Sequence, residues 1–95
     1  MGTTTPALRV DGTHVYFDFV TRSKSGKTLE YHVMTKDDTD CLGSVNWFGR
    51  WRCYAFNPWP GTVFEKTCLR EIADFCERLT KEHRAMRAAQ NESSK

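Results

Sequence analysis

Two stretches in the first third of the chain alternate between apolar and polar residues. The apolar residues that share one face of each extended stretch are Val15, Phe17 and Phe19, and then Leu29, Tyr31 and Val33. A period of two is typical of half-buried antiparallel strands. The connector at residues 22–26 reads RSKSG and is rich in turn formers. The pattern therefore predicts a first β-hairpin.

The segment VNWFGRWRCYAF, residues 45–56, predicts a second hairpin. With Gly49 and Arg50 at the centre of a type II′ turn, Phe48 pairs with Trp51, Trp47 with Arg52 and Val45 with Tyr54. One face then holds Val45, Trp47, Arg52, Tyr54 and Phe56, and the other holds Asn46, Phe48, Trp51, Cys53 and Ala55. A small domain buries only one sheet face well. We therefore expect some of these rings to stay exposed.

The period changes from two to between three and four after about residue 63, which predicts a helix. The apolar residues of its stripe are Cys68, Leu69, Ile72, Ala73, Phe75, Cys76 and Leu79. Thr62 with Glu65 forms a capping-box pattern and Thr67 is a competing N-cap, so two starts remain open. Past Leu79 the stripe thins, with only His83 and Arg87 in line with it. The helix is expected to run beyond the body on which it packs.

Together these elements predict one α+β domain, a four-stranded antiparallel meander of two hairpins packed against one C-terminal α-helix. The sheet is expected over about residues 13–57 and the helix over about 63–89, with a flexible tail at 1–7 and a frayed tail at 90–95. An Asp-Gly turn at Asp11 can add a short strand from Leu8 to Val10.

The charge distribution says more than the net charge of +2, which is too small to imply a nucleic-acid partner. An acidic loop with Asp37, Asp38 and Asp40 directly precedes the hairpin that carries Arg50 and Arg52. No apolar run approaches the roughly 20 residues that span a bilayer. The N-terminus also lacks the pattern of a signal peptide. We expect a cytoplasmic protein without a membrane partner.

Residues that could carry chemistry are few. The four cysteines form no C-x-x-C pair or zinc-finger spacing, which leaves a Cys41–Cys53 disulfide as the pairing to test. His14 and His32 can lie across from each other on the first hairpin, although solvated strand histidines are the simpler interpretation. No spaced Ser/His/Asp set, phosphate loop or H-E-x-x-H motif occurs. We expect no enzyme activity, no cofactor and no metal.

Two binding hypotheses remain. Protein interfaces are enriched in Trp, Tyr, Phe and Arg, which favours a protein-binding site flanked by acids. Its residues would be Trp47, Phe48, Arg50, Trp51 and Arg52, with Asp37, Asp38 and Asp40 as the flank. The alternative is a nucleic-acid-binding module that stacks rings on bases and places arginines on phosphates. The competing structural interpretation is that every ring lies in the core. An exposed apolar sheet face would also favour a homodimer.

One segment resembles a group of short, uncharacterised proteins from tailed bacteriophages and prophages. The residues that carry the resemblance are Leu42-Gly43, Trp47-Phe48-Gly49, Trp51-Arg52, Tyr54, Phe56, Pro58, Thr62, Phe64, Cys68-Leu69, Ile72 and Phe75. The resemblance brings no catalytic motif. It implies an origin in a mobile element and the cytoplasm of a bacterial host as the place of action. It also implies occlusion of a host protein, including inhibition of host defence as an anti-CRISPR.

Overall fold

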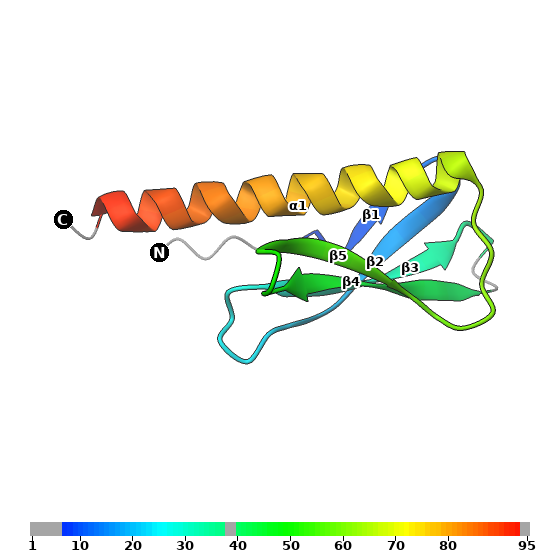
Figure 1. The fold of residues 1–95 in the computed structure, drawn as a ribbon, viewed down its shortest axis with the longest axis horizontal. Helices are drawn as coiled ribbons and strands as arrows, with labels where there is room; N and C mark the ends of the chain where they lie inside the picture. The colour runs from blue at the N-terminus through cyan, green and yellow to red at the C-terminus, as the bar shows by residue number, and fades with distance from the viewer. Residues whose placement is uncertain (1–6, 38–39, 94–95) are drawn as a thin grey trace.

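A computed structural model describes residues 7–37 and 40–93, and side chains as far as residue 88 (Figure 1). It contains one antiparallel sheet, in chain order throughout, and one long helix. The elements are β1 (Arg9–Asp11), β2 (Val15–Arg22), β3 (Leu29–Thr35), β4 (Cys41–Phe48), β5 (Cys53–Pro58) and α1 (Lys66–Ser93). The α+β class and the single C-terminal helix are confirmed. The expected strand count is wrong, since the sheet has five strands rather than four.

The additional strand is β1, which pairs antiparallel with β2. It is shifted by one residue toward the C-terminus relative to the Leu8–Val10 segment that the sequence suggested. The connection is longer than a tight Asp-Gly turn, because Asp11 pairs with Tyr16 and the amide of Gly12 donates to the carbonyl of Val15 at 2.8 Å. Four residues therefore separate the paired positions.

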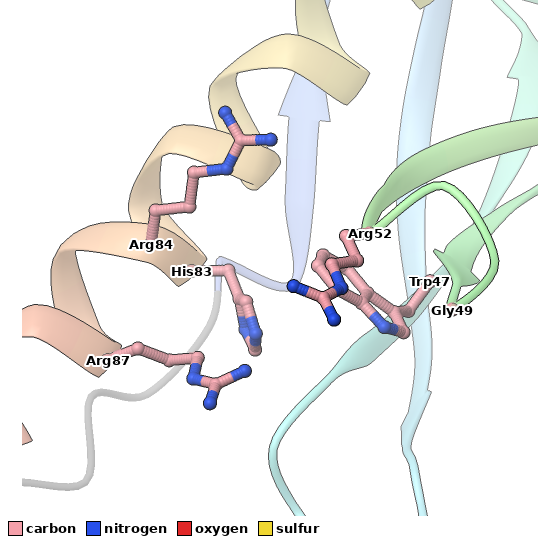
Figure 2. A pocket seen from close by; sticks show the side chains of 6 residues that line it. All are labelled: Trp47, Gly49, Arg52, His83, Arg84 and Arg87. Atoms are coloured by element: carbon pink, nitrogen blue, oxygen red, sulfur yellow. The ribbon is translucent and has the colours of Figure 1, made fainter.

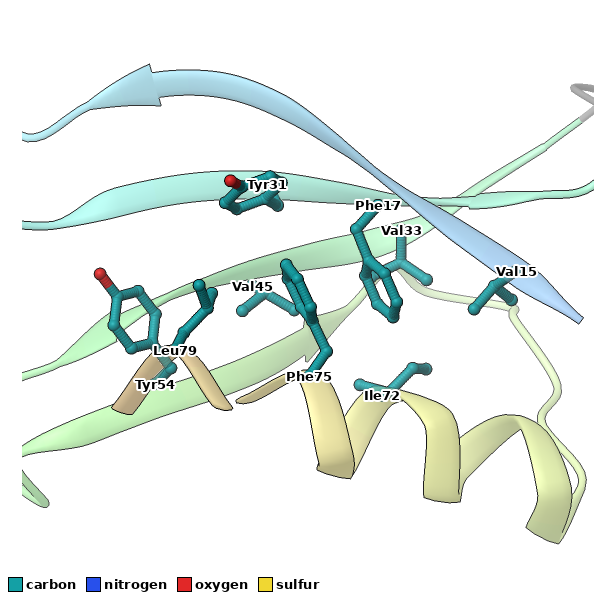
Figure 3. Close-up of a cluster of buried hydrophobic side chains, with 9 residues drawn as sticks. All are labelled: Val15, Phe17, Tyr31, Val33, Val45, Tyr54, Ile72, Phe75 and Leu79. Atoms are coloured by element: carbon teal, nitrogen blue, oxygen red, sulfur yellow. The ribbon is translucent and has the colours of Figure 1, made fainter. Parts of the chain in front are cut away.

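The first predicted hairpin is confirmed as β2 and β3. Phe17 lies opposite Val33, and Phe19 lies opposite Tyr31, so the apolar residues of both strands share one face. α1 covers that face (Figure 3). The ring of Phe75 stacks on Phe17 with centroids 3.9 Å apart and meets the edge of Tyr31 at 5.0 Å. The buried core is made of Val15, Phe17, Tyr31, Val33, Val45, Tyr54, Ile72, Phe75 and Leu79.

The register predicted for the second hairpin is wrong by two residues. The structure pairs Phe48 with Cys53 and Trp47 with Tyr54, so residues 49–52 form the turn. A shift of two preserves the side-chain alternation, and Trp47 and Tyr54 still share the face that α1 covers. The amide of Trp51 donates to the carbonyl of Phe48 at 3.2 Å, and Arg52 adopts a positive φ of 54° that returns the chain to β5.

The N-cap of α1 is Glu65, directly before Lys66, and not either threonine favoured by the sequence. The Glu65 carboxylate accepts the amide of Cys68 at 2.7 Å, while its carbonyl accepts the amide of Leu69 at 3.0 Å. Backbone amides, first that of Cys68 and then that of Thr67, stabilise the carboxylate and lower the pKa of Glu65. The hydroxyl of Thr62 instead donates to the carbonyl of Trp59.

The helix also ends later than expected, at Ser93 rather than near residue 89. Its 28 residues correspond to about 42 Å at 1.5 Å per residue. The longest strands have eight residues, or about 26 Å. The C-terminal end of α1 therefore extends past the β4–β5 turn (Figure 1).

Two polar contacts hold α1 against the sheet. Near its start, the carboxylate of Glu71 accepts the backbone amide of His14 at 3.0 and 3.1 Å. At the middle of the helix, the buried hydroxyl of Thr80 accepts a hydrogen bond from the amide of Tyr54 at 3.0 Å and donates one to the carbonyl of Cys76 at 2.8 Å. The bond from Tyr54 to Thr80 fixes α1 beside the β4–β5 hairpin, where the candidate site lies.

Candidate anion-binding cleft

A cleft of about 540 Å³ opens between the β4–β5 turn and the second half of α1. Figure 2 shows the side chains that line it, which come from the β4–β5 hairpin and from α1. The lining residues are Trp47, Gly49, Arg52, His83, Arg84 and Arg87. Three guanidinium groups, one imidazole and one indole therefore surround the cleft, and none of the lining residues is acidic.

Aromatic contacts form the floor of the cleft. The ring of Trp47 lies on the imidazole of His83 with centroids 4.4 Å apart and meets the edge of Tyr54 at 5.5 Å. His83 is only 9% exposed. Burial lowers the pKa of His83, the charge of Arg87 lowers it further, and a hydrogen bond to the backbone of Lys27 partly opposes both effects. These effects favour the neutral form of the imidazole.

The arginines come from opposite walls. Arg52 projects from the turn, while Arg84 and Arg87 lie one helical turn apart on α1 (Figure 2). No ion pair within 4 Å involves any of the three among the described residues, although the same helix pairs Arg78 with Glu82 and Lys81 with Glu77. The cleft thus presents positive charge without a carboxylate counter-ion.

Arg52 occupies a backbone conformation that favours glycine. A non-glycine residue in the left-handed region costs roughly 1–2 kcal/mol. Arg52 has a φ of 54°, and its side chain lines the same cleft as Trp47 (Figure 2). Strain of this kind is often found at functional sites.

The remaining predicted hairpin residues form an exposed tip beside the cleft. Trp51 is 68% exposed and Phe48 is 38% exposed. Their rings meet edge to face with centroids 4.7 Å apart. Arg50, which lies between Phe48 and Trp51 in the sequence, is also exposed. The structure therefore divides the predicted site, with Trp47 and Arg52 in the cleft and the other three residues at the tip.

The predicted acidic flank does not belong to this surface. Asp37 and Asp40 lie in the β3–β4 loop, at the opposite end of β4 from the turn, which is about 26 Å away along an eight-residue strand. Asp37 accepts a hydrogen bond from the hydroxyl of Thr35 at 2.7 Å. Asp38 lies outside the described residues. Adjacency in sequence was misleading here because a whole strand separates the two segments in space.

The helical residues of the cleft were missed by the site prediction. His83 and Arg87 had a signal in the sequence, since both continue the apolar stripe of the helix where polar residues are unexpected. A polar residue at such a position must either meet a partner or lie beyond the core. Here the ring of His83 contacts the ring of Trp47, and Arg87 lines the cleft.

The other candidate residues are dispersed. His14 lies by Glu71, with Nε2 3.9 Å from the carboxylate, and His32 lies opposite Asp18, so the two histidines do not face each other. All four cysteines are free. Cys41 is the first residue of β4, whereas Cys53 in β5 lies opposite Phe48 at the other end of that strand, so the two are too far apart for a disulfide. Within the described residues, no three His, Cys, Asp or Glu side chains gather as metal ligands, and no helix is long and apolar enough to span a membrane.

The chain was compared with known proteins. No family model and no solved structure matches it. A curated protein of Acholeplasma phage L2, described as an uncharacterized 9.3 kDa protein, is 31% identical over 70 residues. The alignment covers 73% of this chain and 90% of the phage protein. The similarity therefore extends well beyond the segment that suggested a phage protein from sequence.

Proposed function

Because this chain belongs to the family of the uncharacterised 9.3 kDa protein of Acholeplasma phage L2, we propose that it is a non-enzymatic phage protein that binds nucleic acid at its cationic cleft. The observation that carries this proposal is that Arg52, Arg84 and Arg87 line one cleft with an aromatic floor and that none of its lining residues is acidic.

The chemistry of these side chains fits phosphate. A guanidinium donates two parallel hydrogen bonds to two oxygens of a phosphate group, and Arg is preferred over Lys where such geometry matters. Three arginines imply about three neutralised phosphates. For a single strand this predicts a slope of about −2 in the logarithm of affinity against the logarithm of salt concentration. The modest net charge of +2 is compatible with this local, moderately strong site.

The same residues argue against catalysis in the cleft. His83 is the only lining residue that titrates near neutral pH, and the lining offers it no nucleophile to activate and no carboxylate to orient it. An imidazole that lies between an indole and a guanidinium can pack against the indole and can take up a proton when an anion binds.

The test is a titration of fluorescently labelled oligonucleotides of about 15 nucleotides, a length near the upper site size of small binding domains. Arg84→Gln/Arg87→Gln should weaken binding about tenfold and flatten the salt slope. Arg70→Gln/Arg78→Gln removes the same charge from the same helix outside the cleft and should have a much smaller effect. The proposal fails if the wild type binds no oligonucleotide, or if both double variants lose affinity equally.

Arg52→Gly separates binding from folding. Glycine adopts the positive φ of this position freely, so the variant should gain up to about 1 kcal/mol in free energy of unfolding. It should nevertheless bind the oligonucleotide more weakly, because one wall of the cleft loses its guanidinium. A variant that is more stable and binds as well as the wild type would show that Arg52 takes no part in binding.

A second candidate function is occlusion of a host protein, including inhibition of a host defence such as an anti-CRISPR. The exposure of Trp51 beside Phe48 favours it, because exposed aromatic residues are the usual anchors of protein interfaces. A pulldown from nuclease-treated bacterial lysate tests it. This candidate requires one protein to be retained by the wild type but not by Arg50→Ala/Arg52→Ala, and to bind again when purified.

A further inference from the structure

We infer that the bound nucleic acid continues from the cleft across the β2–β3 loop, residues 23–28, where Lys24 and Lys27 contact further phosphates. This inference rests on the proposed function. It adds a third segment of the chain to the binding surface, and it raises the expected number of phosphate contacts from about three to about five.

The β2–β3 loop lies against the aromatic floor of the cleft. The backbone of Lys27 forms a hydrogen bond with the imidazole of His83, which lines the cleft. Two residues later, the amide of Leu29 donates to the hydroxyl of Tyr54 at 3.0 Å, and the rings of Tyr54 and Trp47 are in edge-to-face contact. The loop is therefore a direct neighbour of the cleft.

The loop and the β4–β5 turn lie at the same end of the sheet. Arg22 pairs with Leu29 where β2 and β3 meet the loop, and Phe48 pairs with Cys53 where β4 and β5 meet the turn. Figure 1 shows both connections at the end past which α1 extends. Two strand spacings of about 4.8 Å, or roughly 10 Å in all, separate their centres. Since one strand of B-DNA advances about 3.4 Å per phosphate, roughly three nucleotides bridge this distance.

The two connections carry positive charge without acids. Residues 23–28 contribute two lysines, residues 49–52 contribute two arginines, and neither segment contains Asp or Glu. Lys24 and Lys27 are both exposed. At the opposite end of the sheet Lys36 forms an ion pair with an aspartate at 3.0 Å, whereas no ion pair within 4 Å involves Lys24 or Lys27 among the described residues. Their ammonium groups are therefore available to phosphate.

The loop is ordered by its own hydrogen bonds. The amide of Ser23 donates to the carbonyl of Thr28 at 2.8 Å, and the hydroxyl of Ser23 accepts the amide of Thr28 at 3.2 Å. The hydroxyl of Ser25 accepts the amide of Lys27 at 3.3 Å, and Gly26 supplies a positive φ of 76°. None of these bonds uses a lysine side chain. A loop that is already ordered loses less conformational entropy when a ligand binds.

The experiment measures the salt dependence of binding for a labelled single-stranded oligonucleotide of about 15 nucleotides. Contacts in the cleft alone predict a slope of about −2, and five contacts predict about −3.5. Lys24→Gln/Lys27→Gln should return the slope to about −2 and weaken binding about tenfold at about 0.15 M salt, but much less near about 1 M. Lys24→Arg/Lys27→Arg keeps the charge and should bind as the wild type does.

Lys36→Gln/Lys66→Gln is the matched control. Lys36 follows β3 and Lys66 begins α1, so both lie at the end of the sheet opposite the cleft. This variant loses the same charge and should keep the slope of the wild type. If Lys24→Gln/Lys27→Gln binds no more weakly than this control, or the wild type itself has a slope of about −2, the inference is overturned and the proposed function stands. If the wild type binds no oligonucleotide, the proposed function itself falls.

Discussion

The two halves of α1 have the same helical geometry but different tasks. In the first half, Ile72, Phe75 and Leu79 are buried against the sheet, and Glu71 bonds to the β1–β2 turn. In the second half, His83 is the last buried side chain among those described. The cause of the difference is length, because a helix of about 42 Å crosses strands of at most about 26 Å. Where the sheet ends, side chains that cannot be buried become available for binding.

Of the substitutions that test this comparison, Phe75→Ala should cause the largest loss in free energy of unfolding. Phe75 stacks on Phe17 and contacts Tyr31 in the core, and truncation of a buried Phe costs about 3–5 kcal/mol. Met86→Ala, in the exposed half of the helix, should change the free energy of unfolding by less than about 0.5 kcal/mol. Urea denaturation of both variants measures the difference. Equal losses would mean that the second half of α1 is also part of the folded core.

Glu71→Gln should have the next largest effect. The Glu71 carboxylate accepts the amide of His14 with both oxygens. An amide side chain has only one accepting oxygen and no charge. We expect a loss of about 1–2 kcal/mol in urea denaturation.

Glu77→Gln is the control for this prediction, since among the described residues Glu77 forms an ion pair only with the exposed Lys81, at 3.9 Å. It should cost at most about 0.5 kcal/mol. A Glu71 variant as stable as the Glu77 variant would show that the β1–β2 turn does not depend on the helix.

The halves also differ in how far the sequence predicted them. The apolar stripe through Ile72, Phe75 and Leu79 and the alternation in β2 and β3 identify the core face, because burial requires these periods. The length of the β4–β5 turn could not be predicted, since both registers place Trp47 and Tyr54 on the same face. The cleft depends on contact between the turn and a helix some thirty residues later, and such pairings follow from the tertiary fold rather than from a local pattern.

Protonation of His83 should have the smallest effect and tests the second half of α1 directly. Burial, reinforced by the charge of Arg87, lowers the pKa of His83 from 6.5. Below about pH 6.5 the unfolded chain therefore binds a proton at His83 more readily than the folded chain does. The free energy of unfolding should therefore decline as the pH falls below about 6.5. Glu65 and Asp11, whose pKa values are lowered from 4.5 and 3.8, change the free energy of unfolding only in a more acidic range.

In the cleft, the charge of Arg87 disfavours the charged form of His83, and Arg52 and Arg84 line the same cleft. A bound phosphate should offset the effect of Arg87, so that binding is accompanied by proton uptake and oligonucleotide affinity rises as the pH falls through about 6.5. His83→Gln should flatten the dependence on pH of both stability and affinity, while His32→Gln, which replaces a histidine outside the cleft, should leave both intact. Denaturation and titration across this range measure the two dependences. If His83→Gln retains them, the buried end of α1 is not coupled to the cleft, and the two halves of the helix differ only in exposure.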